Sequence, residues 1–550
     1  MTRATFFGLE IGKTGLSMSQ LGLDVTGHNI ANVDTKGYTR QRIVSTAYDP
    51  FGTIGRALPV SQALVGGGVN VKIHDQIRSA YLDRRYRTEN TLNAYWQKRT
   101  ESMRYLESYF DNVNEETSIN YSIARFFQAM KVLAEDTVEG APRTLLQTAG
   151  KDLVQQLNMI YEGLIDLQET QNQAVLVTVD EINRIADEIS QLNKSIYGFE
   201  ITGHLANDLR DKRNVLLDEL STYVDIEYRD YPDGKGHTKL EVSIGGNVLV
   251  DHADSWQLGV WADADEAPIW EVVWMKNDQS SGLIPDLGNP LVLKSGQLKA
   301  YIDMRDGDGA GSNSKGIPYY IEMLNNLARA LVQEINTVHV QGWTDHPVDD
   351  SSTGILFFND FGAGKVVFSY DDPDDPDKKT GATYIVDEAE LINITARNIC
   401  LSDEVEDNAY NIACSSTRIV NDIKQGKPEE LQRGNNENMN ALYDLFRKKD
   451  IALGAVVSGG VSIGSFDGYA TSIRFDVGNV LNSCIKTSEN SNTLTVAADN
   501  QRISIAGVSL DEEMTNLIRY QHAYNGAARV ITAMDDALDR LINGTGRVGL

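Results

Sequence analysis

The distribution of proline is the feature that most constrains what this 550-residue chain can fold into. Nine of the 12 prolines lie between Pro232 and Pro428, and none follows Pro428. Because a proline inside a helix costs about 3 kcal/mol or more, long proline-free stretches permit long helices. Five of the six tryptophans also lie in the middle, from Trp256 to Trp343. We therefore expect helical outer parts around a middle of different structure.

Apolar periodicity supports this division. One stripe recurs at steps of three and four residues, which is the spacing of one helix face. Its members are Ile182, Ile185, Ile189, Leu192 and Ile196. The middle begins instead with period two, since Leu240, Val242 and Ile244 alternate with polar residues after the turn signal Pro232-Asp233-Gly234. The sequence predicts a mainly α fold with β inserts.

Charge excludes some classes of partner. The chain has 50 Lys and Arg against 78 Asp and Glu, a net charge of −28. Such a polyanion repels phosphates and anionic lipid, so we expect no nucleic-acid or membrane partner. The first ten residues lack the apolar segment of a signal peptide, so export would need another route. The three cysteines have no metal-ligand spacing, and we expect no metal and no cofactor.

The N-terminal segment is apolar on two opposite faces. Leu9, Leu16, Leu23 and Ile30 recur every seven residues, and Ile11, Met18, Leu21 and Val25 form a second stripe. A helix with two apolar faces is sandwiched between neighbours. Four glycines at positions 8, 12, 15 and 22 each cost about 1 kcal/mol of helix propensity, so the segment is marginal alone. An ordinary core helix is the alternative.

The C-terminal segment mirrors this pattern. Apolar or small residues alternate steps of four and three, which is typical of a coiled-coil seam. The seam positions are Leu510, Met514, Leu517, Gln521, Tyr524, Ala528, Ile531, Asp535, Leu538 and Ile542. The two ends carry small opposite net charges. Our hypothesis is that both termini pair in one coiled-coil rod that also packs against other subunits.

Both ends carry a resemblance to a known family. Residues 28–41 (HNIANVDTKGYTRQ) resemble the N-terminal signature of bacterial flagellar axial proteins, which comprise rod, hook and hook-associated proteins. Residues 509–543, with YQHAY at 520–524, resemble the matching C-terminal signature. Interior segments are similar to the hook-associated protein 1 family. These are residues 202–213, 245–250, 334–339 and 434–438.

The resemblance implies a structural role and not an enzymatic one. Members of this family form a ring-like polymer at the junction between hook and filament, outside the cell. The implied partners are further copies of the chain, the hook protein, hook-associated protein 3 and an export chaperone at the C-terminal helix. The termini would be disordered in the monomer, and export would use the flagellar type III apparatus without a cleaved signal peptide. Another axial protein, such as a hook or hook-associated protein 3 relative, is the nearest alternative.

These considerations divide the chain into four parts. Residues 1–45 and 505–550 form the terminal coiled-coil helices. Residues 46–228, 313–342 and 432–504 form a long helical bundle, the rod domain. Residues 229–312 form a central β-rich domain. Residues 343–431 hold 7 Lys and Arg against 19 Asp and Glu, and we expect an acidic variable insert there.

The turn after the N-terminal helix has identifiable chemistry. Asn29, Asn32 and Asp34 are residue types that cap helices and form Asx turns, and Gly37 can supply a positive φ. Arg40 and Arg42 could pair with acids on a neighbouring subunit, whereas the alternative is a solvated helix end. The expected assembly interface consists of Leu9, Leu16, Leu23, Asn29, Ile30, Asn32, Gly37, Leu510, Met514, Leu517, Tyr524, Ile531 and Leu538.

Two other functions compete with this interpretation. Residues 460–464 (GVSIG) match the nucleophile elbow of serine hydrolases, but His522, the one histidine that follows, lies inside the C-terminal heptads. We therefore expect no catalytic residues. A glycan-binding surface is also compatible with the structural role, because exposed tryptophans stack on sugars, although core packing is their commoner fate. The candidates are Trp256, Trp261, Trp270 and Trp274.

Overall fold

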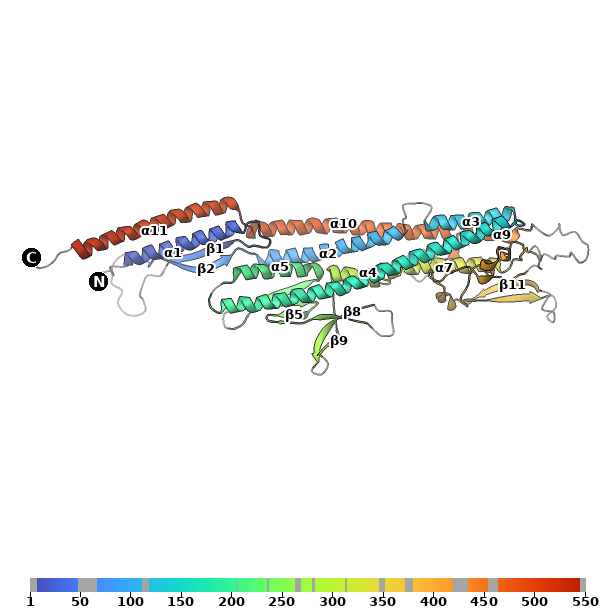
Figure 1. Ribbon diagram of the computed structural model, residues 1–550, viewed down its shortest axis with the longest axis horizontal. Coiled ribbons are helices and arrows are strands. Elements are labelled where there is room, and N and C mark those ends of the chain that lie inside the picture. Colours follow the sequence, from blue (N-terminus) through green and yellow to red (C-terminus); the bar gives the residue numbers. More distant parts are fainter. Residues whose placement is uncertain are drawn as a thin grey trace, which may run out of the picture.

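The chain is an elongated, mainly helical molecule whose first and last helices extend toward the same tip (Figure 1). The computed structural model describes residues 7–47, 67–110, 118–203, 205–234, 237–262, 269–278, 282–311, 314–345, 352–370, 379–418, 434–453 and 463–544. The chain runs away from the tip and returns to it, as Figure 1 shows. The expected fold class, mainly α with β inserts, is confirmed.

Long helices make up the body of the molecule. They are α1 (Phe7–Ala31), α2 (Ala80–Phe110), α3 (Ile119–Glu135), α4 (Gly140–Glu200), α5 (Asn207–Tyr223), α6 (Gln297–Asp306), α7 (Ile317–His339), α10 (Phe466–Ala506) and α11 (Leu510–Gly544), with the short helices α8 (Asp403–Asp407) and α9 (Glu437–Asp444). Helix α4 has 61 residues, so it spans roughly 90 Å. Pro142 lies in its first turn, where a missing N–H does no harm, and the next proline after it is Pro232, beyond the end of the helix.

Small antiparallel sheets pack against this helical body. The first sheet is the hairpin β1 (Gln41–Ala47) and β2 (Val69–Gln76). The middle of the chain forms a four-stranded sheet in the order β3 (Ile226–Pro232), β4 (Thr238–Ile244), β5 (Asn247–Asp251), β6 (Asp254–Ser255), and a three-stranded sheet in the order β7 (Leu258–Trp261), β8 (Glu271–Asp278), β9 (Gly282–Pro290). Two further pairs are β10 (Gly364–Tyr370) with β11 (Lys379–Val386), and β12 (Ile451–Ala452) with β13 (Ile463–Gly464).

Two positive φ angles explain the tight hairpin between β4 and β5. Ile244 pairs with Asn247, so only Gly245 and Gly246 connect β4 to β5. Their φ angles are 56° and 90°, which other residues rarely adopt.

Helix α4 passes through two separate hydrophobic cores. Its first half contributes Leu146 and Leu157 to a core shared with α2, α3, α7 and α10. Its second half contributes Ile182 and Ile189 to a core shared with α5, α6 and the middle sheets. The predicted apolar stripe therefore faces the β-rich part of the chain.

The acidic segment 343–431 differs from the insert that we expected. In its described part, Phe357, Phe358 and Ile394 are fully buried in the first core, beside α3 and α7. Net charge is a poor guide here because acidic side chains stay at the surface while apolar residues between them are buried. The acidic run at 371–377 lies outside the described residues.

The three cysteines form no disulfide bond. Cys414 and Cys484 are buried and Cys400 is partly buried, and all three thiols are free. Among the described residues, no helix combines the length and the apolar character that crossing a membrane requires.

A salt-bridge cluster joins the helices α2, α5 and α10 at the end of the body from which α1 and α11 extend. Asp218 on α5 accepts hydrogen bonds from Arg87 Nε on α2 at 2.7 Å and from Arg502 Nη1 on α10 at 2.5 Å. The Arg502 guanidinium also lies 4.0 Å from the centre of the Tyr86 ring. The body is therefore held rigidly where the terminal helices leave it.

Candidate assembly interface

Helices α1 and α11 pack side by side in opposite directions. The Cβ positions built on Gly8 and Gly22 of α1 lie 1.8 Å from Met534 Cε and 2.5 Å from Tyr520 Cδ1. A Cβ at Gly22 would overlap the Tyr520 ring, whereas one at Gly8 would displace only the flexible end of Met534, so the close approach of the two helices depends most on Gly22. Figure 1 shows the pair as an extension beyond the helical body.

The face of α1 that meets α11 is a stripe of small residues at steps of four and three. Its members are Gly8, Gly12, Gly15, Ser19, Gly22 and Thr26. A Cβ at Gly12 would lie 2.8 Å from Ile531 Cγ1, and one at Gly15 would lie 3.6 Å from Ala527. The glycines of the N-terminal helix therefore follow a heptad spacing of their own and form its contact face. From the sequence we expected them mainly to lower the helix propensity.

The seam of α11 is shifted from the predicted one. The rows that face α1 include Tyr520, Ala527 and Met534, each one residue before a predicted seam position. Predicted residues Leu517, Tyr524, Ile531 and Leu538 are partly buried. By contrast, Leu510 and Met514 are 48% and 50% exposed. A heptad pattern identifies one row of residues on a helix face. It leaves open whether the second row of the seam begins three or four residues after the first.

The apolar side chains of this pair are incompletely covered. Among the side chains of α1 and α11 that the structure describes, Val25 is the one apolar side chain that is buried. Predicted residues Leu9, Leu16, Leu23 and Ile30 are partly exposed. On α11, Ile518 and Ile542 are 51% and 70% exposed. The pair leaves two apolar surfaces uncovered within one chain.

Asn29 connects the two helices to the first hairpin. Its Nδ2 donates to Gln41 O at 2.9 Å and to Glu513 Oε2 at 3.0 Å. Its Oδ1 accepts from Gln41 N at 3.0 Å and from the Tyr38 hydroxyl at 2.8 Å. The side chain is buried, and all four of its hydrogen bonds are made. The site therefore requires asparagine, because a carboxylate at this position would lack the two N–H donors that bond Gln41 and Glu513.

Arg40 pairs within the chain, which corrects the expectation of a partner on a neighbouring subunit. Its guanidinium donates to Glu513 Oε1 at 2.8 Å and to Glu512 Oε2 at 2.6 Å. Glu513 is buried, so this contact joins the turn to the start of α11 out of water. Arg42 lies 3.8 Å from Asp75, its partner across the hairpin.

A second contact joins the turn to the helical body. Thr39 donates to Asp211 on α5 from its backbone N at 3.0 Å and from its hydroxyl at 2.7 Å. Burial raises the pKa of the Asp211 carboxyl, while the Thr39 hydrogen bonds and the charge of Arg78 oppose the shift. The Arg78 guanidinium donates two hydrogen bonds to the Asp83 carboxylate, from Nε to Oδ2 at 2.6 Å and from Nη2 to Oδ1 at 3.1 Å. We call Asn29, Thr39, Arg40, Arg78, Asp211 and Glu513 the joint.

The joint brings two distant sequence blocks into contact. Residues 28–41 supply the turn, and residues 202–213 supply Asp211 and Asp208, whose carboxylate accepts from Gln41 Nε2 at 3.0 Å. Nothing in the sequence of either block indicates that the two lie in contact.

Gly37 and Asn32 shape the turn as predicted. Gly37 has φ 79°, and a Cβ there would lie 2.1 Å from Val215 Cγ2 on α5. Asn32 Nδ2 donates to His28 O at 3.0 Å, which satisfies a carbonyl at the end of α1. The positive φ and the close approach both require glycine at position 37.

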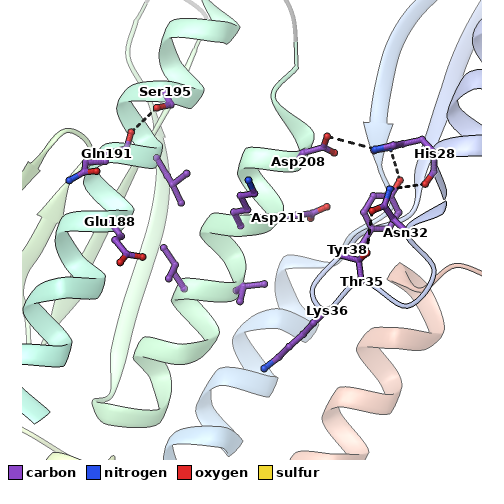
Figure 2. Close-up of a pocket in the computed structure, with 14 residues that line it drawn as sticks. His28, Asn32, Thr35, Lys36, Tyr38, Glu188, Gln191, Ser195, Asp208 and Asp211 are labelled. Carbon is purple, nitrogen blue, oxygen red and sulfur yellow. Dashed lines mark hydrogen bonds and ion pairs between the residues drawn. The ribbon is translucent and has the colours of Figure 1, made fainter. Parts of the chain in front are cut away.

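A cleft of about 790 Å³ opens beside the joint, between the turn and the helices α4 and α5. Figure 2 shows His28, Asn32 and Tyr38 on one side and Glu188, Gln191 and Ser195 on the other. His28 Nε2 lies 3.9 Å from Asp208 Oδ2. Burial, followed by the charge of Asp208, raises the pKa of the Tyr38 hydroxyl. These groups engage one another and present no nucleophile paired with a base.

The hydrolase motif has no catalytic geometry in the described part of the chain. Residues 460–462 lie outside the described residues, and Gly464 ends β13 just before α10. His522 is exposed on α11, beyond the far end of the 41-residue α10. Among the described residues, no three His, Cys, Asp or Glu side chains gather as a metal site would require.

Family models match three parts of the chain. The model of the flagellar hook-associated protein FlgK helical domain matches residues 103–358. The model of the flagellar basal body rod FlgEFG protein C-terminal region matches residues 499–544, and that of the flagella basal body rod protein matches residues 9–39. The two end models fall on α11 and α1.

Whole-length relatives agree with these matches. Flagellar hook-associated protein 1 of Bacillus subtilis is 29% identical over 99% of both chains. The protein of the same name from Escherichia coli is 24% identical over 96% of this chain and 98% of its own length. The structure of the flagellar hook junction protein FlgK from Burkholderia pseudomallei matches with a TM-score of 0.55 at 14% identity, over 78% of this chain and 100% of that one.

The matches at both ends, in the helical body and over the whole length exclude the serine hydrolase and select one branch of the axial proteins. The chain is similar over its whole length to flagellar hook-associated protein 1, and it is a structural protein of the bacterial flagellum at the junction of hook and filament, not an enzyme.

Proposed function

We propose that the α1–α11 pair is the surface through which copies of this chain polymerise into a ring-like layer. The observation that carries this proposal is the near absence of fully buried apolar side chains in two helices of 25 and 35 residues. A pair of this length is stable in water only when its apolar faces are covered. Further copies of the same pair are the simplest cover.

The neighbours above and below this layer are the hook protein and hook-associated protein 3. In support, the models that match α1 and α11 are those of basal body rod proteins, so the same two-helix ends occur in several axial proteins. Ends of one kind can stack on one another along a shared axis. The rod-like body and the β-rich part would then set the outer contacts that distinguish the layers.

The terminal helices fold on assembly and are protected before it. The glycines of α1 disfavour an isolated helix by about 1 kcal/mol each. The exposed apolar residues of α11, Leu510 and Met514 among them, suit the groove of an export chaperone in the cytoplasm. Export through the flagellar apparatus without a cleaved signal peptide then brings the chain outside the cell, to the flagellum.

Amide hydrogen exchange on the purified monomer and on the assembled junction tests this proposal. We expect fast exchange in residues 7–31 and 510–544 of the monomer, slow exchange in α4, and protection of both ends after assembly. Strong protection of both ends in a verified monomer would contradict folding on assembly.

A charge substitution separates assembly from folding. Leu517→Glu places a carboxylate in the partly buried row of α11, and we expect it to prevent incorporation while the exchange of α4 is unchanged. The matched control is Gln521→Glu, at an exposed position of the same helix. Normal incorporation of the Leu517 variant would count against the proposed surface.

A further inference from the structure

A second cleft lies where the two middle sheets meet. It has a volume of about 630 Å³, within the range of small-molecule sites, roughly 300–1,000 Å³. Strands β5, β8 and β9 and the link between β6 and β7 form its walls. It shares no residue with the joint or with the α1–α11 pair.

The backbone fixes an exposed tryptophan at this cleft. Trp256 N donates to Leu249 O at 2.8 Å on one sheet, and the next residue, Gln257, accepts from Met275 N at 2.9 Å on the other. The Trp256 side chain is nevertheless 42% exposed, whereas Trp274, in the same lining, is only 4% exposed. An indole ring that the backbone holds in place but leaves open to solvent is a ready stacking surface.

Amide side chains with unused hydrogen-bonding capacity line the same cleft as Trp256. Asn247 Nδ2 donates to Asn289 Oδ1 at 3.1 Å, which leaves the Asn289 amino group and the Asn247 carbonyl oxygen unused by other described residues. The Gln257 side chain lines the cleft and makes no hydrogen bond with the described residues. Partly buried amides in this state are complementary to a ligand that carries several hydroxyl groups.

The charges of the cleft are balanced. Lys276 Nζ lies 3.0 Å from Asp286 Oδ1, so the lining's cation is already paired. An anionic ligand would find no free positive charge there, and the chain's net charge of −28 also opposes it. A purely apolar ligand would bury the amides without partners.

From this geometry we propose that the cleft binds a neutral oligosaccharide. The C–H face of a sugar ring stacks on Trp256, and its hydroxyl groups exchange hydrogen bonds with Gln257 and Asn289. In Figure 1, β8 and β9 project on the side of the molecule opposite α10 and α11. The cleft therefore stays accessible when the terminal helices are covered, and the inference does not depend on the proposed polymerisation surface.

Calorimetry and tryptophan footprinting on the full chain test the proposal. The probes are two neutral hexasaccharides, chitohexaose and maltohexaose. We expect saturable binding of at least one and slower oxidation of Trp256 by N-bromosuccinimide in its presence, read by mass spectrometry. The buried Trp274 is the internal reference.

Variants locate the binding. Trp256→Ala should weaken binding by about tenfold or more, because it removes the stacking surface. Leu287→Ala is the matched control, since Leu287 is 59% exposed on β9 and lies outside the lining. Hydrogen exchange of β5 and β8 shows whether the Trp256 variant keeps its fold. Gln257→Ala, which leaves the indole in place, should weaken binding severalfold.

Three results would overturn the inference. They are no saturable binding of either hexasaccharide, binding that survives Trp256→Ala unchanged, and protection of Trp256 by a neutral extended peptide but by neither sugar. Assembly of the junction is measured separately, so failure here leaves the polymerisation surface untouched.

Discussion

Two glycines of α1 allow the close approach of α11 to be tested by the same substitution in different surroundings. Gly22 lies against Tyr520, where a Cβ would be 2.5 Å from Cδ1, whereas a Cβ at Gly27 would meet nothing within 4 Å. Both positions lie inside the helix Phe7–Ala31. Alanine at either position should therefore improve helix propensity equally and differ only in packing.

The magnitudes follow from these surroundings. Gly27→Ala should stabilise α1 by about 1 kcal/mol through helix propensity. Gly22→Ala has the same gain but forces the Tyr520 ring or the helix to shift, and overpacking of this kind costs roughly 1–3 kcal/mol. The two variants should then differ by about 1–3 kcal/mol, which is about 5- to 150-fold in an opening equilibrium.

Hydrogen exchange of α1 in the assembled protein is the assay. We expect slower exchange than the parent in Gly27→Ala, and exchange in Gly22→Ala that is faster than in Gly27→Ala by the stated factor. The double variant Gly22→Ala, Tyr520→Leu should recover part of the loss, because leucine frees the space that the added methyl group needs. Equal exchange in the two single variants would refute the contact between α1 and α11 at this point.

Two further predictions concern the body and the joint. Burial lowers the pKa of His339 from 6.5 to about 4, so the folded chain keeps the imidazole neutral while the unfolded chain binds a proton below pH 6.5. Stability is therefore lost as pH falls, by about 2 kcal/mol between roughly pH 7 and pH 5 from this group, and His339→Gln should flatten that part of a denaturation series. At the joint, Thr39→Val removes the hydrogen bond from the Thr39 hydroxyl to the buried Asp211. The loss should lower the local stability of β1 by about 1–3 kcal/mol and so speed its amide exchange. Thr46→Val, at an exposed position of β1, should leave that exchange unchanged.

Local patterns in the sequence were enough to predict much of the fold. Spacing of proline and isoleucine predicted α4 and its buried face, and the alternation of Leu240, Val242 and Ile244 predicted the strand β4. Gly37 was assigned its positive φ from the turn chemistry around it. Each of these features depends on residues within a few positions of one another, so a sequence pattern can capture it.

The joint and the seam could not be predicted in the same way because they depend on long-range contacts. Arg40 pairs with Glu513, 473 residues away, and no local pattern separates that partner from an acid on another subunit. The heptad pattern of α11 likewise predicted one of the two rows of residues in the seam. Whether Met514 or Glu513 belongs to the second row depends on which of them faces α1, and Met514 is exposed. The apolar residues of the acidic segment were overlooked because charge was averaged over the whole stretch.

The small-residue stripe of α1 has two opposite physical consequences. Alone, its glycines weaken the helix, since each raises the conformational entropy of the unfolded chain. Against α11, the same glycines remove the side chains that would otherwise keep the helix axes apart, which lets Tyr520, Ile531 and Met534 reach the backbone of α1. Replacing the stripe with alanine or leucine would strengthen the isolated helix and exclude its partner. The sequence thus places stability in the contact between helices and not in either helix, which is what the proposed folding of both helices on assembly requires.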